Sequence, residues 1–149
     1  MIKSNWLTGL SLLMIGSFLA CTRNTLSLPE PALSLAGTYQ GKPNNTPFLI
    51  NGETVDIQIL PVAIDSVEVV MRGYVNGQQT DSLVYARDLV KQEFQTTALS
   101  KGCISYRIDL NTGKETNQLT MTCSEVNTLI YTFVPAGQTV GTRIRFKKS

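Results

Sequence analysis

The sequence predicts an all-β domain, an antiparallel barrel or a sandwich, over residues 35–149. Polar and apolar residues alternate at 54–59 (TVDIQI) and at 142–147 (TRIRFK), as in strands with one buried face, because successive side chains point to opposite sides of a sheet. Gly, Asn and Pro separate such runs at intervals of roughly ten residues, which is typical of barrels and sandwiches. The sequence shows no repeat of about 20–50 residues, which argues against a propeller or a solenoid.

The N-terminal residues 1–20 are predicted to be a signal peptide. Lys3 supplies a positive charge, residues 7–20 (LTGLSLLMIGSFLA) form an uncharged apolar run, and the small residue Ala20 ends it. These are the three parts of a secretory signal. The run is shorter than the about 20 residues that a membrane-spanning helix needs, so we expect cleavage rather than a transmembrane helix.

Cys21 follows the apolar run directly. Phe18-Leu19-Ala20-Cys21 resembles the lipobox of bacterial lipoproteins, although that family prefers Leu at the first position and a small residue at the second. The resemblance implies that Cys21 becomes the first mature residue and carries acyl chains such as palmitate. Two or more chains anchor a protein stably to a membrane, so we expect a lipoprotein of the cell envelope, attached to the outer membrane and facing the periplasm or the cell surface. The alternative is an ordinary secreted protein.

A tether is predicted at residues 21–34, between the anchor and the domain. It contains Pro29-Glu30-Pro31 and shows neither alternation nor a helical period. Prolines keep such a segment extended and fairly stiff. The tether would hold the domain away from the membrane surface.

A hairpin turn is predicted at Asn76-Gly77, because this dipeptide suits the positive φ angles of a type I′ turn. A two-residue turn makes three pairs that favour the prediction, two of them apolar and one of opposite charge. The pairs are Val69 with Val84, Val70 with Leu83, and Arg72 with Asp81.

Residues 88–99 (DLVKQEFQTTAL) are more ambiguous. Val90, Phe94 and Ala98 fit one face of a strand, but they are also spaced as on one face of a helix. We favour a strand because Thr96 and Thr97 disfavour a helix.

Cys103 and Cys123 form an even pair in an exported domain, and we predict a disulfide between them. The alternative is two separately buried thiols. A thiol-redox role is not expected, because the sequence has no C-x-x-C motif.

The two cysteines bracket a second predicted hairpin with its turn at 111–114. A four-residue loop pairs Ile104 with Met121 and Tyr106 with Leu119, but it turns the cysteines to opposite faces. A loop of odd length places the cysteines directly opposite each other, but it pairs Ile104 and Tyr106 with threonines. A bulge near the strand ends would reconcile the two.

Gly37-Thr38-Tyr39, at the start of the domain, resembles the Gly-x-Trp motif in the first strand of lipocalins and related calycins, with Tyr in place of Trp. The resemblance implies an up-and-down barrel of about eight strands with an interior binding cavity. In that family an arginine of the last strand packs on the aromatic ring. Arg143 or Arg145 lies in the corresponding strand, although alternation with Ile144 and Phe146 turns both outward.

Composition argues against catalysis, metal binding and nucleic acid as a partner. The chain has no histidine, and its charge is nearly balanced, with 13 basic and 11 acidic residues. Ser66 and Ser105 lack a nucleophile motif. We therefore predict no enzyme activity, no cofactor and no metal site. The scattered carboxylates are interpreted as outward-facing strand residues: Glu53, Asp56, Asp65, Glu68 and Asp109.

The predicted activity is noncatalytic binding of a small apolar ligand inside the barrel. The residues expected to line the cavity are Val55, Ile57, Tyr106 and Phe133. The alternative is a protein-interaction module, such as an envelope assembly component or a hydrolase inhibitor, that acts through its loops. The basic ending of the chain, Arg143, Arg145, Lys147 and Lys148, could meet anionic lipid or an acidic partner, but we favour a solvated outer face.

Overall fold

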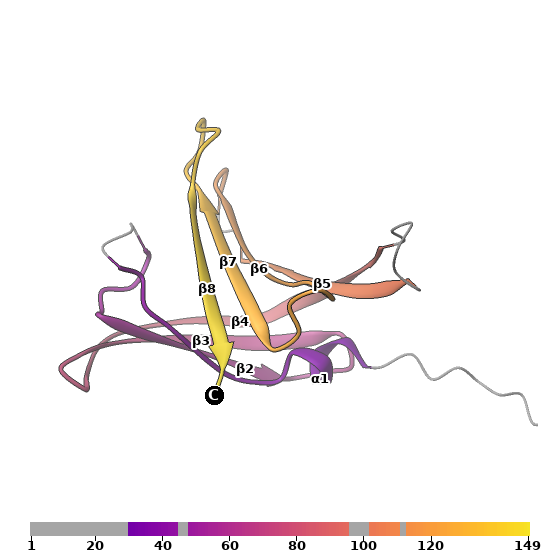
Figure 1. Ribbon diagram of the computed structural model, residues 1–149, viewed down its shortest axis with the longest axis horizontal. Coiled ribbons are helices and arrows are strands. Elements are labelled where there is room, and N and C mark those ends of the chain that lie inside the picture. Colours follow the sequence, from indigo (N-terminus) through magenta and orange to yellow (C-terminus); the bar gives the residue numbers. More distant parts are fainter. Residues whose placement is uncertain (1–29, 45–47, 96–101, 111–112) are drawn as a thin grey trace, which may run out of the picture.

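The computed structural model describes residues 30–44, 48–95, 102–110 and 113–149, which form a closed antiparallel barrel (Figure 1). Each strand pairs with the next along the chain, and the last closes on the first. The strands are β1 (Gly37–Gly41), β2 (Thr54–Pro61), β3 (Ser66–Val75), β4 (Gln78–Gln95), β5 (Cys103–Asp109), β6 (Thr116–Met121), β7 (Thr128–Val134) and β8 (Thr142–Lys148). The predicted eight-stranded up-and-down barrel is confirmed, and the sandwich is not formed.

Alternation of side chains fills much of the barrel interior. In β2, Val55, Ile57 and Ile59 are buried, while the residues between them are only half-buried. In β8, Ile144 and Phe146 point inward. The largest fully buried side chains are Tyr39, Tyr131, Phe146, Leu35, Ile57, Ile59, Met71, Ile108, Leu110, Leu119, Leu129 and Ile130.

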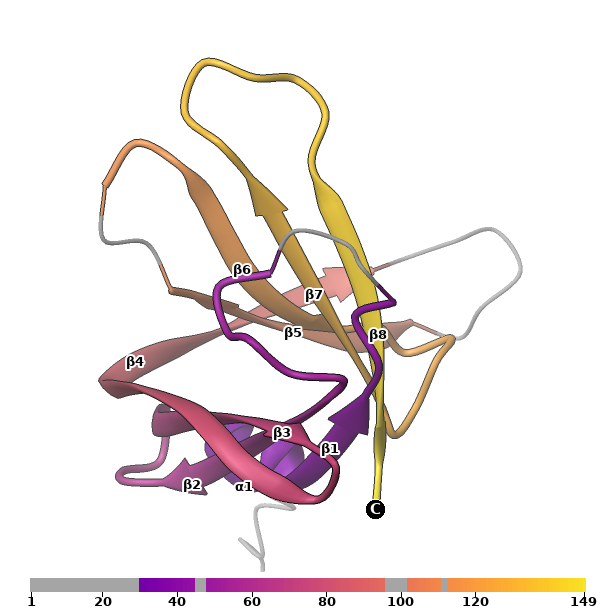
Figure 2. The same ribbon diagram turned by 90° about the vertical axis from the view of Figure 1, so that its left-hand side faces the viewer.

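The short helix α1 (Pro31–Leu35) covers one end of the barrel, which we call the closed end (Figure 2). Pro31 stands in the first turn, where its fixed φ suits a helix. Ala32 and Leu35 are buried, and the Ala32 N–H donates to the Ile64 carbonyl in the β2–β3 connection (3.1 Å). The folded part therefore begins earlier than predicted, because residues 31–34 belong to α1 and not to the tether. Residues 21–29 lie outside the described part of the chain.

The β3–β4 turn is at Asn76-Gly77 as predicted, with positive φ at both residues. The predicted pairs beyond it are wrong by one residue. Val69 pairs with Tyr85, Val70 with Val84, and Arg72 with Ser82. A bulge in β4, opposite the step from Gly73 to Tyr74, causes the shift: the extra residue is Thr80, whose Oγ1 donates to the carbonyls of Asn51 (3.1 Å) and Gly73 (3.3 Å).

The long strand β4 bends between two partners. Its first part pairs with β3, and residues 90–95 pair with β5. The bend coincides with Arg87, which has a φ of 60°, and with a second shift of register between Val67 and Val69 of β3. The strand predicted for 88–99 is confirmed as far as Gln95, while 96–99 lie outside the described residues.

Cys103 and Cys123 lie at disulfide distance, with their Cα atoms 5.8 Å apart, as predicted. Neither predicted register is correct, because Tyr106 pairs with Met121 and Ile108 with Leu119. The hairpin connection is longer than four residues, since the Leu110 N–H still donates to the Asn117 carbonyl (2.7 Å). Cys123 lies beyond the end of β6. The alternation of side chains along β6 therefore does not determine the direction of the Cys123 side chain.

A basic residue of the last strand does pack on Tyr39, but it is Lys148 rather than Arg143 or Arg145. Lys148 Nζ lies 5.7 Å from the centre of the Tyr39 ring and donates to the Ala36 carbonyl (2.7 Å). The Tyr39 hydroxyl donates to the Leu35 carbonyl (2.8 Å), and burial raises the pKa of Tyr39 to about 12. These contacts join α1, β1 and β8 at the closed end.

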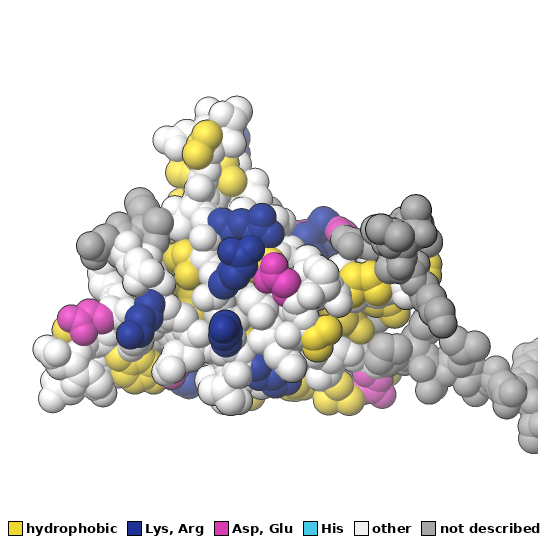
Figure 3. All heavy atoms as spheres, viewed as in Figure 1, with side chains coloured by type: hydrophobic (Ala, Val, Ile, Leu, Met, Phe, Trp, Pro, Cys, Tyr) yellow, Lys and Arg dark blue, Asp and Glu magenta, His cyan; other side chains and the backbone are white. Residues whose placement is uncertain are grey.

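The outer face of β8 carries a row of basic side chains (Figure 3). Arg143, Arg145 and Lys147 are exposed, and Arg145 forms an ion pair with Glu125 (3.2 Å). Within the described ranges, no helix is long and apolar enough to cross a membrane.

Candidate functional site

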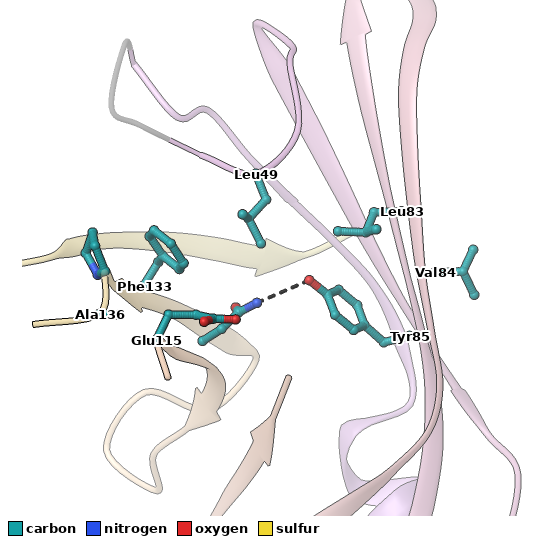
Figure 4. Close-up of a pocket in the computed structure, with 9 residues that line it drawn as sticks. Leu49, Leu83, Val84, Tyr85, Glu115, Phe133 and Ala136 are labelled. Carbon is teal, nitrogen blue, oxygen red and sulfur yellow. Dashed lines mark hydrogen bonds between the residues drawn. The ribbon is translucent and has the colours of Figure 1, made fainter. Parts of the chain in front are cut away.

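A pocket of about 580 Å³ opens at the end of the barrel opposite α1 (Figure 4). We call it the mouth pocket. Its size lies within the range of about 300–1,000 Å³ that is usual for small-molecule sites. The lining residues come from the β1–β2 connection, from β4, from the start of β6 and from the end of β7: Leu49, Leu83, Val84, Tyr85, Glu115, Asn117, Phe133, Pro135 and Ala136.

Residues 48–51 of the β1–β2 connection fold into the barrel mouth and form one wall. Phe48 packs edge-on against Tyr131 (4.6 Å between ring centres), and Ile50 is buried. The Asn51 N–H donates to the Asp81 carboxylate of β4 (3.1 Å). These contacts hold Leu49, which lies between Phe48 and Ile50, at the pocket wall (Figure 4).

The bend of β4 leaves the space of the mouth pocket open on the side opposite Leu49. β5 pairs with residues 90–95, so among the described residues the part of β4 that carries Leu83 and Tyr85 is paired only with β3. Leu83 and Tyr85 point into this opening, toward the side that carries Phe133, whereas Val84 points away (Figure 4). A smaller hollow of about 220 Å³ shares Phe133 and Pro135 with the mouth pocket.

A buried polar side chain, Asn117, and a half-buried one, Tyr85, lie at the inner side of the pocket. Asn117 is 2% exposed, and its Nδ2 donates to the Tyr85 hydroxyl (3.1 Å) and the Leu110 carbonyl (3.3 Å). Burial raises the pKa of Tyr85; the Asn117 hydrogen bond opposes this, while the negative charges of Asp88 and Glu115 add to it. Most of the pocket wall is therefore apolar, and its polar groups are Glu115 and the Asn117–Tyr85 pair.

Tyr131 and Asp88 add two further polar groups in the same region. The Tyr131 hydroxyl is buried without a hydrogen-bond partner in the described part of the chain, and burial, together with Tyr85, raises its pKa. One carboxylate oxygen of Asp88, Oδ2, is also buried without a partner there, and burial raises the pKa of Asp88.

Asp88→Asn is expected to stabilise the protein at pH 7, by less than about 1 kcal/mol, because the amide avoids the cost of burying a charge that solvent already screens in part. The raised pKa means that the Asp88 carboxyl binds its proton more tightly in the native state than in the unfolded chain. The free energy of unfolding of the wild type therefore falls as the pH rises from the ordinary Asp range through the raised pKa.

Urea unfolding at pH 7 and pH 4 tests this prediction. The difference between Asp88→Asn and the wild type should shrink at the lower pH. Asp56→Asn is the matched control, because Asp56 accepts a hydrogen bond from Gln40 on the outer face (3.0 Å). Destabilisation by Asp88→Asn at pH 7 would contradict the prediction.

The four residues predicted to line a cavity have different positions. Phe133 lines the mouth pocket. Tyr106 is half-buried and packs against the core, while Val55 and Ile57 are fully buried within it. These last three do not line the mouth pocket.

Sequence reasoning missed Leu49, Leu83, Tyr85 and Asn117. One signal was available for Asn117: in residues 116–121 (TNQLTM), it occupies the same face as Leu119 and Met121. A polar residue on an otherwise apolar face marks an interior hydrogen-bonding position.

The carboxylates outside the pocket mainly form ion pairs at the surface. Asp109 accepts from Lys91 (2.6 Å) and pairs with Arg107 (3.2 Å), which also contacts Glu93. Among the described residues, no three His, Cys, Asp or Glu side chains are grouped so that they could hold a metal ion.

No protein-family model, no curated protein and no solved structure matches the chain.

Proposed function

We propose that this protein is a noncatalytic binding protein of the bacterial cell envelope, which takes a small, largely apolar ligand into the mouth pocket. The observation that carries the proposal is the pocket itself. Apolar side chains from three parts of the chain, the β1–β2 connection, β4 and the end of β7, surround about 580 Å³, and the buried Asn117 and the half-buried Tyr85 provide a polar end. Such a combination of apolar walls and few polar groups is typical of small-molecule sites.

The proposal includes a membrane anchor on Cys21, supported by the lipobox-like residues 18–21. α1 lies at the closed end, so the chain enters the barrel opposite the mouth pocket. A tether from Cys21 would thus leave the pocket accessible from the side away from the membrane. Cys21→Ser should abolish acylation and membrane retention, and an unchanged membrane fraction would contradict this part.

Binding can be tested with the unacylated mature chain, residues 21–149 with Cys21→Ser, and the neutral apolar fluorophore N-phenyl-1-naphthylamine. Leu83→Trp is expected to weaken probe binding at least tenfold, because the larger side chain occupies the pocket; tenfold corresponds to about 1.4 kcal/mol. Leu89→Trp is the matched control, since Leu89 lies on the same strand, is 52% exposed and does not line the pocket.

Directly excited probe fluorescence gives the Kd for each variant, and circular dichroism checks that each is folded. Equal weakening by both substitutions would mean that the probe binds elsewhere. Failure of the wild type to bind any apolar probe would favour the alternative of a protein-interaction module.

A further inference from the structure

We infer that the mouth pocket selects ligands with an uncharged polar end and disfavours carboxylates. This inference rests on the proposed function and specifies the ligand class for the same site. It follows from the charges around the pocket, the hydrogen bonds within it and the apolar character of its walls.

The charges near the pocket are negative. Glu115 is the one ionisable carboxylate among the lining residues, and none of these residues is Lys or Arg. Asp88 lies close enough to Tyr85 to act on it electrostatically, as Glu115 does. Lys114 is next to Glu115 in the sequence, but its side chain is exposed and does not line the pocket.

A ligand carboxylate would therefore lose water in the pocket without gaining a cationic partner. Burying an unpaired charge is far more costly than burying a neutral polar group, and like charges nearby add to the cost. The basic side chains Arg107 and Arg145 are engaged with surface carboxylates. Among the described residues that line the pocket, none is a cation that could pair with a fatty-acid-like head group.

The pocket can nevertheless offer a hydrogen bond to a neutral head group. The Tyr85 hydroxyl accepts a hydrogen bond from Asn117 Nδ2 (3.1 Å), and a phenol can donate its own proton at the same time. That proton can be donated to an alcohol or carbonyl oxygen of a ligand. The apolar walls formed by Leu49, Leu83 and Phe133 would contact the rest of the molecule.

The test is displacement of N-phenyl-1-naphthylamine from the unacylated mature chain at pH 7.5 by 1-dodecanol and by dodecanoate. These two ligands share an alkyl chain and differ in the charge of the head group. We expect the alcohol to displace the probe at a concentration at least tenfold lower than the carboxylate does.

Glu115→Gln should raise the affinity for dodecanoate several-fold relative to the affinity for dodecanol. Glu125→Gln is the control, because Glu125 lies at the closed end in an ion pair with Arg145, and it should change neither affinity. Equal or tighter binding of dodecanoate to the wild type would overturn the inference, as would a Glu115→Gln effect that is the same for both ligands.

Different results would contradict the proposed function and the head-group preference. If the wild type binds neither the probe nor either ligand, the proposed function fails and this inference fails with it. If the probe binds but dodecanol does not displace it, or dodecanoate displaces it better, only the inference about the head group is overturned.

Discussion

Replacing both Cys103 and Cys123 by serine is expected to lower the free energy of unfolding by about 3 kcal/mol. The cross-link joins residues 20 apart in sequence, and its removal returns conformational freedom to the unfolded chain. It also joins the start of β5 to the segment after β6, and β5 and β6 pair directly over only a few residues, from Tyr106–Met121 to Asp109–Gln118.

Urea unfolding of the wild type with and without a reductant, and of the double variant under both conditions, measures this contribution. The reductant should destabilise the wild type by the same amount as the double substitution and should leave the variant unchanged. A loss below about 1 kcal/mol would show that the pair contributes little to stability.

The fold class could be predicted because each strand carries its own pattern. Residues 54–59 and 142–147 alternate, and in the barrel their apolar residues are inside and their polar residues outside. The turn at Asn76-Gly77 could be predicted for the same reason, because its φ values depend on local residues. Such features can be recognised from the local sequence, without knowing where distant parts of the chain lie.

Strand register could not be predicted in the same way, because distant residues determine it. The Thr80 bulge is held by a hydrogen bond to the carbonyl of Asn51. Gly73 is needed beside it, since a Cβ at that position would lie 2.2 Å from the Asn51 oxygen. Neither contact can be inferred from the hairpin sequence alone, so the one-residue shift was missed.

The mouth pocket depends on these same nonlocal features. It exists because β4 bends near Arg87 and because the β1–β2 connection packs Phe48 and Ile50 into the mouth. Phe133 could be predicted as an inward aromatic residue, but the separation of filled core from open pocket could not. That separation decides which inward residues contact a ligand.

Ile57→Ala is expected to lower the free energy of unfolding by about 2–5 kcal/mol and to leave probe affinity within twofold of the wild type. Ile57 is fully buried in the core, so truncation loses apolar contacts and leaves a cavity. Phe133→Ala should instead weaken probe binding about tenfold, the equivalent of about 1.4 kcal/mol, and cost less stability, because Phe133 is half-buried and lines the mouth pocket.

Urea unfolding and N-phenyl-1-naphthylamine titration of both variants show which residue stabilises the core and which contributes to probe binding. The variants remove similar apolar side chains at two depths of the same barrel, so each is the control for the other. If Ile57→Ala remained folded yet lost probe binding, ligands would have to reach the filled interior, and the mouth pocket would be only the entrance to the site. If Phe133→Ala bound the probe normally, the probe would not occupy the mouth pocket, because this aromatic ring forms part of its wall.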